Sequence, residues 1–147
     1  MAWKGLCLLT NSPVPILCVV SESMAPAFHR GDVLILWNWA LSAEVGDIPV
    51  VWFDGCSLPM VHRVIQVYPS KSHGGDISYT FLTKGDNNNL TDVALYPALR
   101  TSVTRKEVVG FVRGYVPFLG WVVICLREVY WMKYFVCLLI LCMIFTS

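Results

Sequence analysis

Four side chains of this sequence could together carry out a hydrolysis: Ser23, His62, Asp86 and Asp92. A serine hydroxyl is a weak nucleophile and needs a base that removes its proton during attack. An imidazole suits that task because it titrates near neutral pH, and a buried carboxylate can orient the ring and stabilise its cationic form. Residue types alone do not separate a catalytic set from chance, so the elements that carry these side chains must be considered.

Ser23 lies in a polar stretch between two apolar segments, 14–20 and 33–37, which are predicted to be strands. The stretch contains Pro26, which favours extended geometry in the residue before it, and the turn signal Gly31–Asp32. We therefore expect a fixed turn that presents the Ser23 hydroxyl at the edge of a strand.

The other elements are predicted to be mainly extended. Alternating or β-branched apolar patterns predict strands over 33–38, 48–53, 60–68, 77–83 and 107–116. Pro49 favours an edge position for its strand, and Gly110 and Gly114 predict β-bulges in the last one. The stretch 69–76 (PSKSHGGD) is predicted to be a loop and 84–89 (KGDNNN) a tight polar turn. These patterns predict a small, mainly antiparallel β domain.

Composition points to a membrane and away from nucleic acid. The 147 residues carry a formal net charge of +1 without a dense basic patch, so no nucleic-acid partner is expected. Only 14% of residues are charged, against about a quarter in a typical soluble domain. Segment 134–145 is apolar throughout but shorter than the roughly 20 residues of a bilayer span, which favours a tilted, interfacial or partner-supported helix. A buried core helix is the alternative.

The six cysteines indicate neither a disulfide framework nor a metal site. No two of them have CxxC spacing, and most lie in apolar runs, where cysteine behaves as a small hydrophobic residue. We expect no cofactor.

Four segments resemble the sequence boxes of type I signal peptidases in order and spacing: 21–32 (SESMAPAFHRGD), 59–64 (PMVHRV), 81–88 (FLTKGDNN) and 110–120 (GFVRGYVPFLG). The resemblance extends from about Trp3 to the C-terminus. It implies a membrane-bound serine endopeptidase with a signal-peptidase-like β domain, which removes signal peptides after small residues at an A-x-A-like site. Its partners would be signal peptides of nascent pre-proteins, accessory subunits of the signal peptidase complex and membrane lipid.

The resemblance also implies roles for single residues. Ser23 matches the family nucleophile and His62 the general base, and this histidine is similar to the eukaryotic endoplasmic-reticulum form, because bacterial relatives use lysine. Asp92 aligns with the acidic member of the family's charge relay, the set that includes the serine and the base. Asp86 is an alternative or supporting carboxylate, or it only stabilises its turn. Ser21 is a candidate helper in the oxyanion hole, or a simple turn hydroxyl.

Several positions depart from the family pattern. Ala25 stands where the family commonly has glutamate, and Thr91 where an acidic residue often precedes the aligned aspartate. Lys84 is a rival candidate for the base, but it does not match the family's lysine position.

The resemblance implies three parts of the chain: a remnant of an N-terminal membrane anchor (1–12), a catalytic β domain (13–117) and a helical, membrane-associated segment (118–147). The expected N-terminal membrane helix is truncated, because the short remnant cannot cross a hydrocarbon core of about 30 Å. The implied location is the endoplasmic-reticulum membrane with the catalytic domain facing the lumen.

Two rival functions remain open at this point. A catalytically inactive family member could act as a structural subunit of the complex, which the missing anchor favours and the intact candidate residues oppose. A self-cleaving repressor with a related β fold would need a DNA-binding helical module and a lysine base, and neither is visible.

Overall fold

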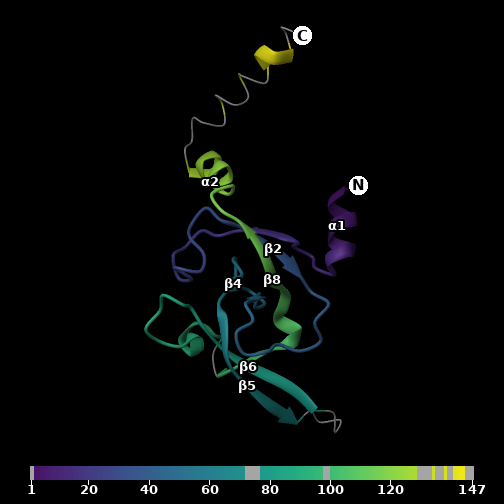
Figure 1. Cartoon of the computed structure of the whole chain (residues 1–147), viewed down its shortest axis with the longest axis vertical. Coiled ribbons are helices and arrows are strands. Elements are labelled where there is room, and N and C mark those ends of the chain that lie inside the picture. The colour runs from purple at the N-terminus through teal and green to yellow at the C-terminus, as the bar shows by residue number, and fades with distance from the viewer. Residues whose placement is uncertain are drawn as a thin grey trace.

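The computed structural model describes residues 2–71, 77–97, 100–128, 134, 138 and 141–144, and shows a mainly β structure (Figure 1). Its helices and strands, in chain order, are α1 (Ala2–Thr10), β1 (Ile16–Cys18), β2 (Val33–Trp37), β3 (Pro49–Val51), β4 (Met60–Val61), β5 (Arg63–Lys71), β6 (Ile77–Lys84), the 3-10 helix η1 (Asp92–Leu95), β7 (Val103–Thr104), the 3-10 helix η2 (Arg105–Glu107), β8 (Val108–Val116) and α2 (Trp121–Glu128).

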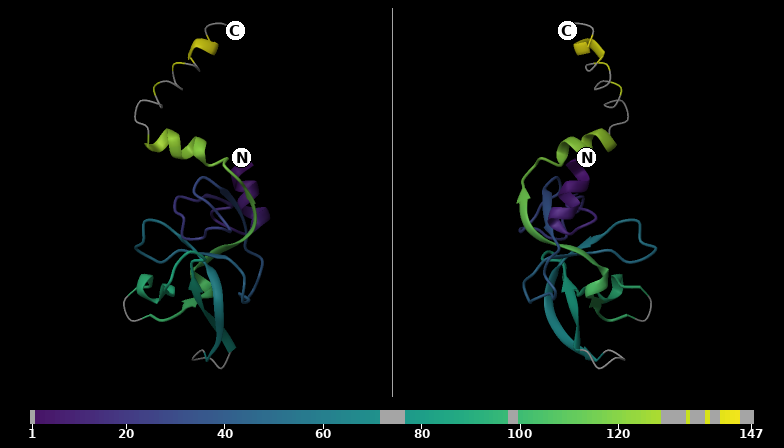
Figure 2. Two further views of the ribbon diagram at one scale, coloured as in Figure 1. Left: turned by 60° about the vertical axis from the view of Figure 1, so that its left-hand side comes forward. Right: turned by 90° about the vertical axis from the view of Figure 1, so that its right-hand side faces the viewer.

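The strands form two sheets in which every pair is antiparallel, as predicted. One sheet has the order β1-β2-β8-β3-β4, and the other has the order β5-β6-β7. The long β5–β6 hairpin extends to one end of the molecule, while α1 and α2 lie at the opposite end (Figure 2). No helix within the described ranges combines the length and the apolar character needed to cross a membrane.

Strand β8 is the longest strand of the larger sheet and contains both predicted bulges. Its register against β2 shifts between the partners of Ile35 and Leu36, which leaves Arg113 out of the pairing beside Gly114. Its register against β3 shifts in the same way and leaves Val109 out beside Gly110. Bulges bend a strand and increase its twist, which lets β8 curve around the core.

Two apolar clusters make up the core. Strand β2 shows the alternation expected for a half-buried strand, since Leu34 and Leu36 are buried and Ile35 is exposed. Met24 and Phe28, from the turn after Ser23, are buried in the same cluster as these leucines. The turn is therefore anchored to the core directly after Ser23, in agreement with the predicted fixed turn.

Three predictions about the strands are wrong. β3 is an interior strand, and Pro49 fits there because β4 pairs only with Val50 and Val51. The predicted strand 60–68 is divided at His62, where the chain passes from one sheet to the other. β5 continues to Lys71, so the first residues of the predicted loop are strand.

Proline at position 69 is compatible with β5 because this strand lies at the edge of its sheet. The remainder of the predicted loop, 72–76, lies outside the described residues. Helix α2 begins at Trp121, three residues later than predicted, after Phe118 with a positive φ of 62°. Most of the apolar segment 134–145 also lies outside the described residues.

The start of α2 packs against the turn that follows Ser23. The Gly120 N–H donates to the Gly31 carbonyl at 2.7 Å, and the Phe118 N–H donates to Asp32 Oδ1 at 3.2 Å. Gly31 has φ +95°, and a Cβ there would lie 2.3 Å from the Trp121 ring, so only glycine fits. The segment that leads into the helix is thus joined to the turn by one backbone bond and one bond to the Asp32 side chain.

Candidate active site

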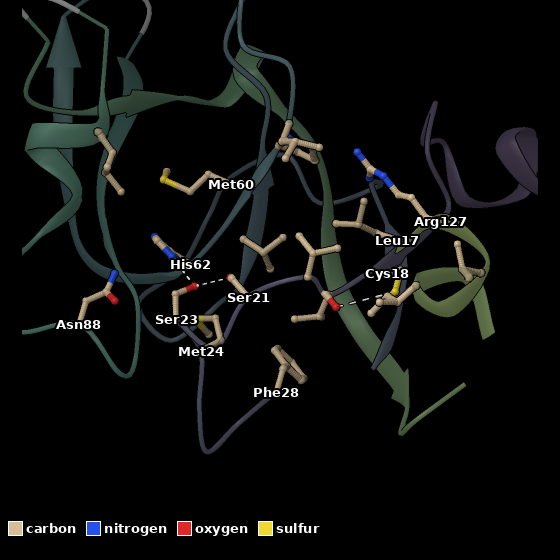
Figure 3. Close-up of a pocket in the computed structure, with 18 residues that line it drawn as sticks. Leu17, Cys18, Ser21, Ser23, Met24, Phe28, Met60, His62, Asn88 and Arg127 are labelled. Atoms are coloured by element: carbon tan, nitrogen blue, oxygen red, sulfur yellow. Dashed lines mark hydrogen bonds between the residues drawn. The ribbon is translucent and has the colours of Figure 1, made fainter. Parts of the chain in front are cut away.

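The Ser23 turn forms one side of an apolar pocket of about 590 Å³ (Figure 3). Segment 17–21, segment 58–62 and helix α2 provide most of its wall. Ser21, Ser23 and His62 lie at one end of the pocket, whereas Arg127 of α2 lies at the other end with Leu17 (Figure 3). The pocket thus has a polar end beside Ser23 and a mainly apolar body.

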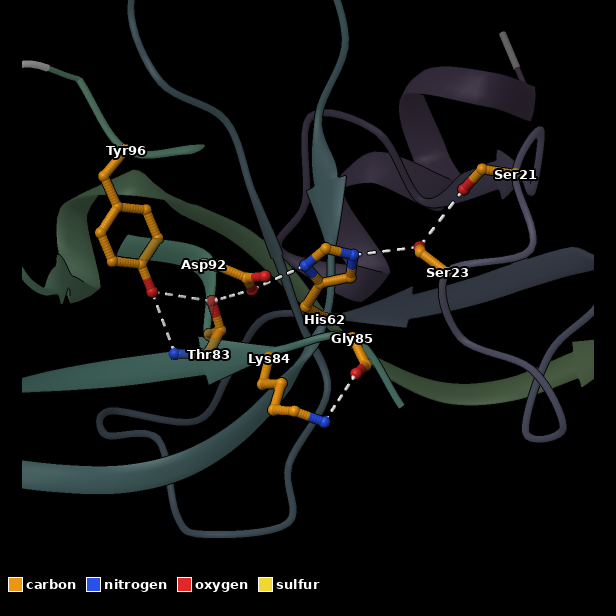
Figure 4. Close-up of polar contacts among 8 residues, drawn as sticks. All are labelled: Ser21, Ser23, His62, Thr83, Lys84, Gly85, Asp92 and Tyr96. Atoms are coloured by element: carbon orange, nitrogen blue, oxygen red, sulfur yellow. Dashed lines mark hydrogen bonds and ion pairs between the residues drawn. The ribbon is translucent and has the colours of Figure 1, made fainter. Parts of the chain in front are cut away.

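His62 bridges Ser23 and Asp92 (Figure 4). Its Nε2 lies 3.0 Å from Ser23 Oγ, and its Nδ1 lies 2.6 Å from Asp92 Oδ2. With the proton on Nδ1, the ring donates to the carboxylate and accepts from the serine hydroxyl. This arrangement can move the Ser23 proton to the imidazole while the carboxylate stabilises the cation that forms.

The positions of these three residues follow from the local fold. His62 is the residue between β4 and β5, and the change of sheet directs its side chain inward, with 5% of its surface exposed. Asp92 begins η1 and is 1% exposed. Ser23 is held by the buried side chains of Met24 and Phe28, which follow it in the turn. The three residues therefore come from separate elements that meet at the pocket.

Asp86 does not contact His62 but forms a bidentate ion pair with Arg63. Arg63 Nε donates to Asp86 Oδ1 at 2.9 Å and its Nη2 to Oδ2 at 2.6 Å. The hydrogen bonds from Arg63 hold the pKa of Asp86 below its usual value. The next residue, Asn87, donates its backbone N–H to the Ser23 carbonyl at 2.9 Å. Asp86 therefore stabilises the turn that lies against the Ser23 backbone.

Curated proteins of several fungi are similar to this chain. It is 48% identical over 134 residues to the signal peptidase complex catalytic subunit SEC11 of Leptosphaeria maculans, an alignment that covers 90% of this chain and 75% of the relative. It is 45% identical over 135 residues to the subunit of the same name in Candida tropicalis, with 91% and 78% of the two chains covered. The chain belongs to the family of signal peptidase complex catalytic subunits. As a member it is classed as a signal peptidase, a protease. No protein-family model matches it.

In this signal peptidase family member, the Ser21 hydroxyl lies 3.3 Å from Ser23 Oγ. The Ser23 backbone N–H donates to no group among the described residues. The Ser23 N–H is therefore free to face a carbonyl oxygen brought beside Ser23. The Ser21 hydroxyl donates to Ser23 Oγ, whose own proton goes to His62, and would have to turn toward that carbonyl oxygen. Lys84 lies apart from this cluster and directs its Nζ to the Gly85 carbonyl at 3.4 Å (Figure 4).

Thr83 and Tyr96 are two further members of the polar cluster that the sequence analysis did not identify. Thr83 Oγ1 donates to Asp92 Oδ2 at 2.7 Å and lies 2.9 Å from the Tyr96 hydroxyl. Thr83 lies within the segment 81–88 and Tyr96 four residues after Asp92, but the sequence analysis gave neither side chain a role. The alternating pattern of β6 indicates only that Thr83 faces inward, and no sequence pattern marked Tyr96.

Proposed function

We propose that this chain removes N-terminal signal peptides from secretory and membrane pre-proteins as a serine endopeptidase. In this proposal Ser23 is the nucleophile, His62 the general base and Asp92 the carboxylate that orients the ring. The single observation that carries the proposal is the His62 side chain, which bonds Ser23 Oγ through one nitrogen and Asp92 through the other. The family membership supports the same activity.

The first half of the reaction forms an acyl-enzyme. As the Ser23 oxygen attacks the scissile carbonyl carbon, its proton passes to His62 Nε2. The resulting imidazolium keeps its Nδ1–H directed at Asp92 Oδ2, which stabilises the positive charge in a site that excludes most water. The protonated ring then gives its proton to the leaving amine, and the mature protein departs.

The carbonyl oxygen gains negative charge during the attack and needs hydrogen-bond donors. The Ser23 N–H and the Ser21 hydroxyl are our candidates for this oxyanion hole. The N–H has no acceptor among the described residues, and the Ser21 hydroxyl, 3.3 Å from Ser23 Oγ, can turn from that oxygen to the carbonyl oxygen during the attack. Water then attacks the ester, with His62 as base, and the Ser23 hydroxyl is restored. All protons in the cycle pass through His62 Nε2.

The pocket supports an extended peptide with small apolar side chains next to the cleaved bond. Strands β1 and β4 are the two edges of the larger sheet, and residues of both line the pocket. A peptide laid between them can hydrogen-bond to a strand edge while alternate side chains enter the apolar wall. Met24 and Val61 line this wall and are the sequence neighbours of Ser23 and His62, so we expect small residues at the A-x-A-like positions beside them.

We assign the protein to the endoplasmic-reticulum membrane, with its β domain facing the lumen and accessory subunits of the complex as partners. Under this proposal residues 1–12 belong to an anchor, 13–117 to the catalytic domain and 118–147 to a membrane-associated segment in contact with lipid. The apolar sequence of 134–145 supports the last assignment.

The proposal is tested by co-expressing the full chain with the accessory subunits and a pre-protein, and by following cleavage. We expect wild-type protein to cleave, and Ser23→Ala and His62→Ala to lose nearly all activity while still assembling. Ser42→Ala, a serine substitution outside the pocket, is the matched control and should cleave normally. Equal processing by wild type, Ser23→Ala and His62→Ala would refute the mechanism and favour a structural subunit.

A further inference from the structure

Two buried side chains outside the proposed proton path, Thr83 and Tyr96, lie directly behind Asp92 (Figure 4). Thr83 is fully buried and Tyr96 is 7% exposed. Thr83 Oγ1 lies 2.7 Å from Asp92 Oδ2 and 2.9 Å from the Tyr96 hydroxyl oxygen. The Thr83 backbone N–H also donates to this hydroxyl oxygen, at 3.0 Å.

The donors and acceptors of this network fix the direction of each bond. An ionised carboxylate accepts only, so the single Thr83 hydroxyl proton points to Asp92. The Tyr96 oxygen accepts from the Thr83 N–H, which leaves its own proton to donate to Thr83 Oγ1. The order of donation is therefore Tyr96 to Thr83 to Asp92, and His62 donates to the same carboxylate oxygen from the other side.

Tyr96 is held firmly in this position. Its ring packs against the ring of Phe53, with centroids 5.7 Å apart at 60°. Burial raises the pKa of Tyr96, so the hydroxyl keeps its proton and remains a donor. Thr83 belongs to β6, which pairs with β5 along its length. Both members of the network are thus attached to rigid parts of the fold.

We propose that Thr83 and Tyr96 are positioning residues that hold Asp92 Oδ2 toward His62 and moderate its negative charge. This inference rests on the proposed function, because it concerns the same relay. Within the described residues, the carboxylate makes its side-chain contacts only through Oδ2, to Thr83 and His62. Without the Thr83 hydroxyl, His62 alone would hold Asp92, and the carboxylate could rotate about its last bond.

Loss of the positioning of Asp92 and loss of the moderation of its charge have different effects on the kinetics. Lost positioning lowers kcat with little change in KM, because the substrate pocket is lined by other residues. Lost charge moderation leaves a carboxylate that attracts the imidazolium more strongly, so the acid limb of the pH profile moves to higher pH. A purely structural role would lower the rate by the same factor at every pH. Asp86 interacts electrostatically with His62, and Asp86 and its charged neighbours Arg63 and Lys84 are unchanged in the variants.

The experiment uses the full chain in its complex and a pre-protein with an A-x-A-like site, with kcat, KM and pH profiles measured. Thr83→Val removes the donor to the carboxylate and is expected to lower kcat about 10- to 100-fold. Tyr96→Phe removes two bonds to Thr83, both between neutral groups, and is expected to lower kcat about two- to tenfold. Thr83→Ser keeps the hydroxyl and should restore both the rate and the profile.

Matched controls come from the same strand. Thr80→Val and Tyr79→Phe remove the same groups elsewhere on β6 and should leave kcat and the profile unchanged. Melting temperatures of all variants show whether the protein remains folded. Because Tyr96→Phe preserves the ring and its packing, it keeps the proposal testable even if Thr83→Val fails to fold.

The outcomes separate this inference from the proposed function. If wild type cleaves, Ser23→Ala does not, and the Thr83 and Tyr96 variants match wild type in kcat and pH profile, only the positioning proposal is overturned. A uniform loss of rate without a shift of the acid limb overturns it as well. If Ser23→Ala cleaves as well as wild type, the proposed function itself fails.

Discussion

Replacing Asp86 with asparagine tests how the ion pair with Arg63 supports the nucleophile. The substitution keeps the size of the side chain but removes its charge and turns one acceptor into a donor that faces the guanidinium. Arg63 retains its bond to the Gly46 carbonyl at 3.2 Å, so it is not left without a partner. The turn 84–89 would lose its ion pair to β5 but keep the backbone pairing of Lys84 with Arg63.

The expected magnitude follows from the geometry and the exposure of the pair. Two charge-assisted hydrogen bonds in a buried site would contribute about 1.5–3 kcal/mol each. Here 35% of the Arg63 side chain and 21% of the Asp86 side chain are exposed, so solvent weakens the pair. We expect a loss of about 1–2 kcal/mol in the free energy of unfolding, and a fall of about 2–8 °C in melting temperature.

Activity should fall less than with a relay substitution. Asn87 bonds the Ser23 carbonyl at 2.9 Å and, through Nδ2, the Glu22 carbonyl at 3.1 Å, so a looser turn shifts the nucleophile without removing any proton donor or acceptor. We expect kcat to decrease about tenfold, because small misplacements of reacting groups slow the chemical step.

The assay combines thermal unfolding with a double-mutant cycle that uses Arg63→Gln. Asp86 has a lowered pKa when folded, so its stabilisation is complete above the ordinary aspartate pKa of about 4 and is lost as the pH falls below that value. The difference between wild type and Asp86→Asn should therefore shrink at low pH. Strictly additive effects of the two substitutions would show that the pair is not coupled, and would refute this reasoning.

Three further substitutions address other parts of the molecule. Asp92→Asn should lower kcat about 10³- to 10⁴-fold in the cleavage assay, because the amide would favour the wrong tautomer of His62; a loss below tenfold would contradict the relay. Gly85→Ala should reduce cleavage more than tenfold with modest loss of stability, since a Cβ would lie 2.7 Å from the Ser23 carbonyl oxygen. Normal cleavage kinetics of this variant would contradict the expectation. Phe111→Ala should lower the free energy of unfolding by about 3–5 kcal/mol in a denaturation experiment, because this ring is fully buried; a change under 1 kcal/mol would show that the core had collapsed around it.

The sequence was sufficient to predict the features that depend on local chemistry. The turn around Ser23 follows from its proline, its Gly–Asp pair and the apolar segments beside it. The bulges next to Gly110 and Gly114 follow from the weakness of glycine in a strand interior. The antiparallel β class was predicted from the same kind of signal, short alternating runs separated by turn residues. The two observed sheets confirm it.

Features that depend on contacts across the fold could not be predicted. The two carboxylates Asp86 and Asp92 lie close together in the sequence, and only the fold shows that Arg63 takes the first while His62 bonds the second. Thr83 carried no signal, because a threonine on a strand is common and its bond to Asp92 spans a change of element. The division of the strand at His62 was missed because alternation continues across it, although the two halves join different sheets.

The junction between α2 and the Ser23 turn has a mechanical consequence. The helix supplies part of the pocket wall and is also fixed, through Gly120 and Gly31, to the segment that carries the nucleophile. Arg30 and Glu128 form a second contact between the two, an ion pair at the surface. A displacement of α2 would therefore shift the pocket wall and the segment that carries Ser23 together.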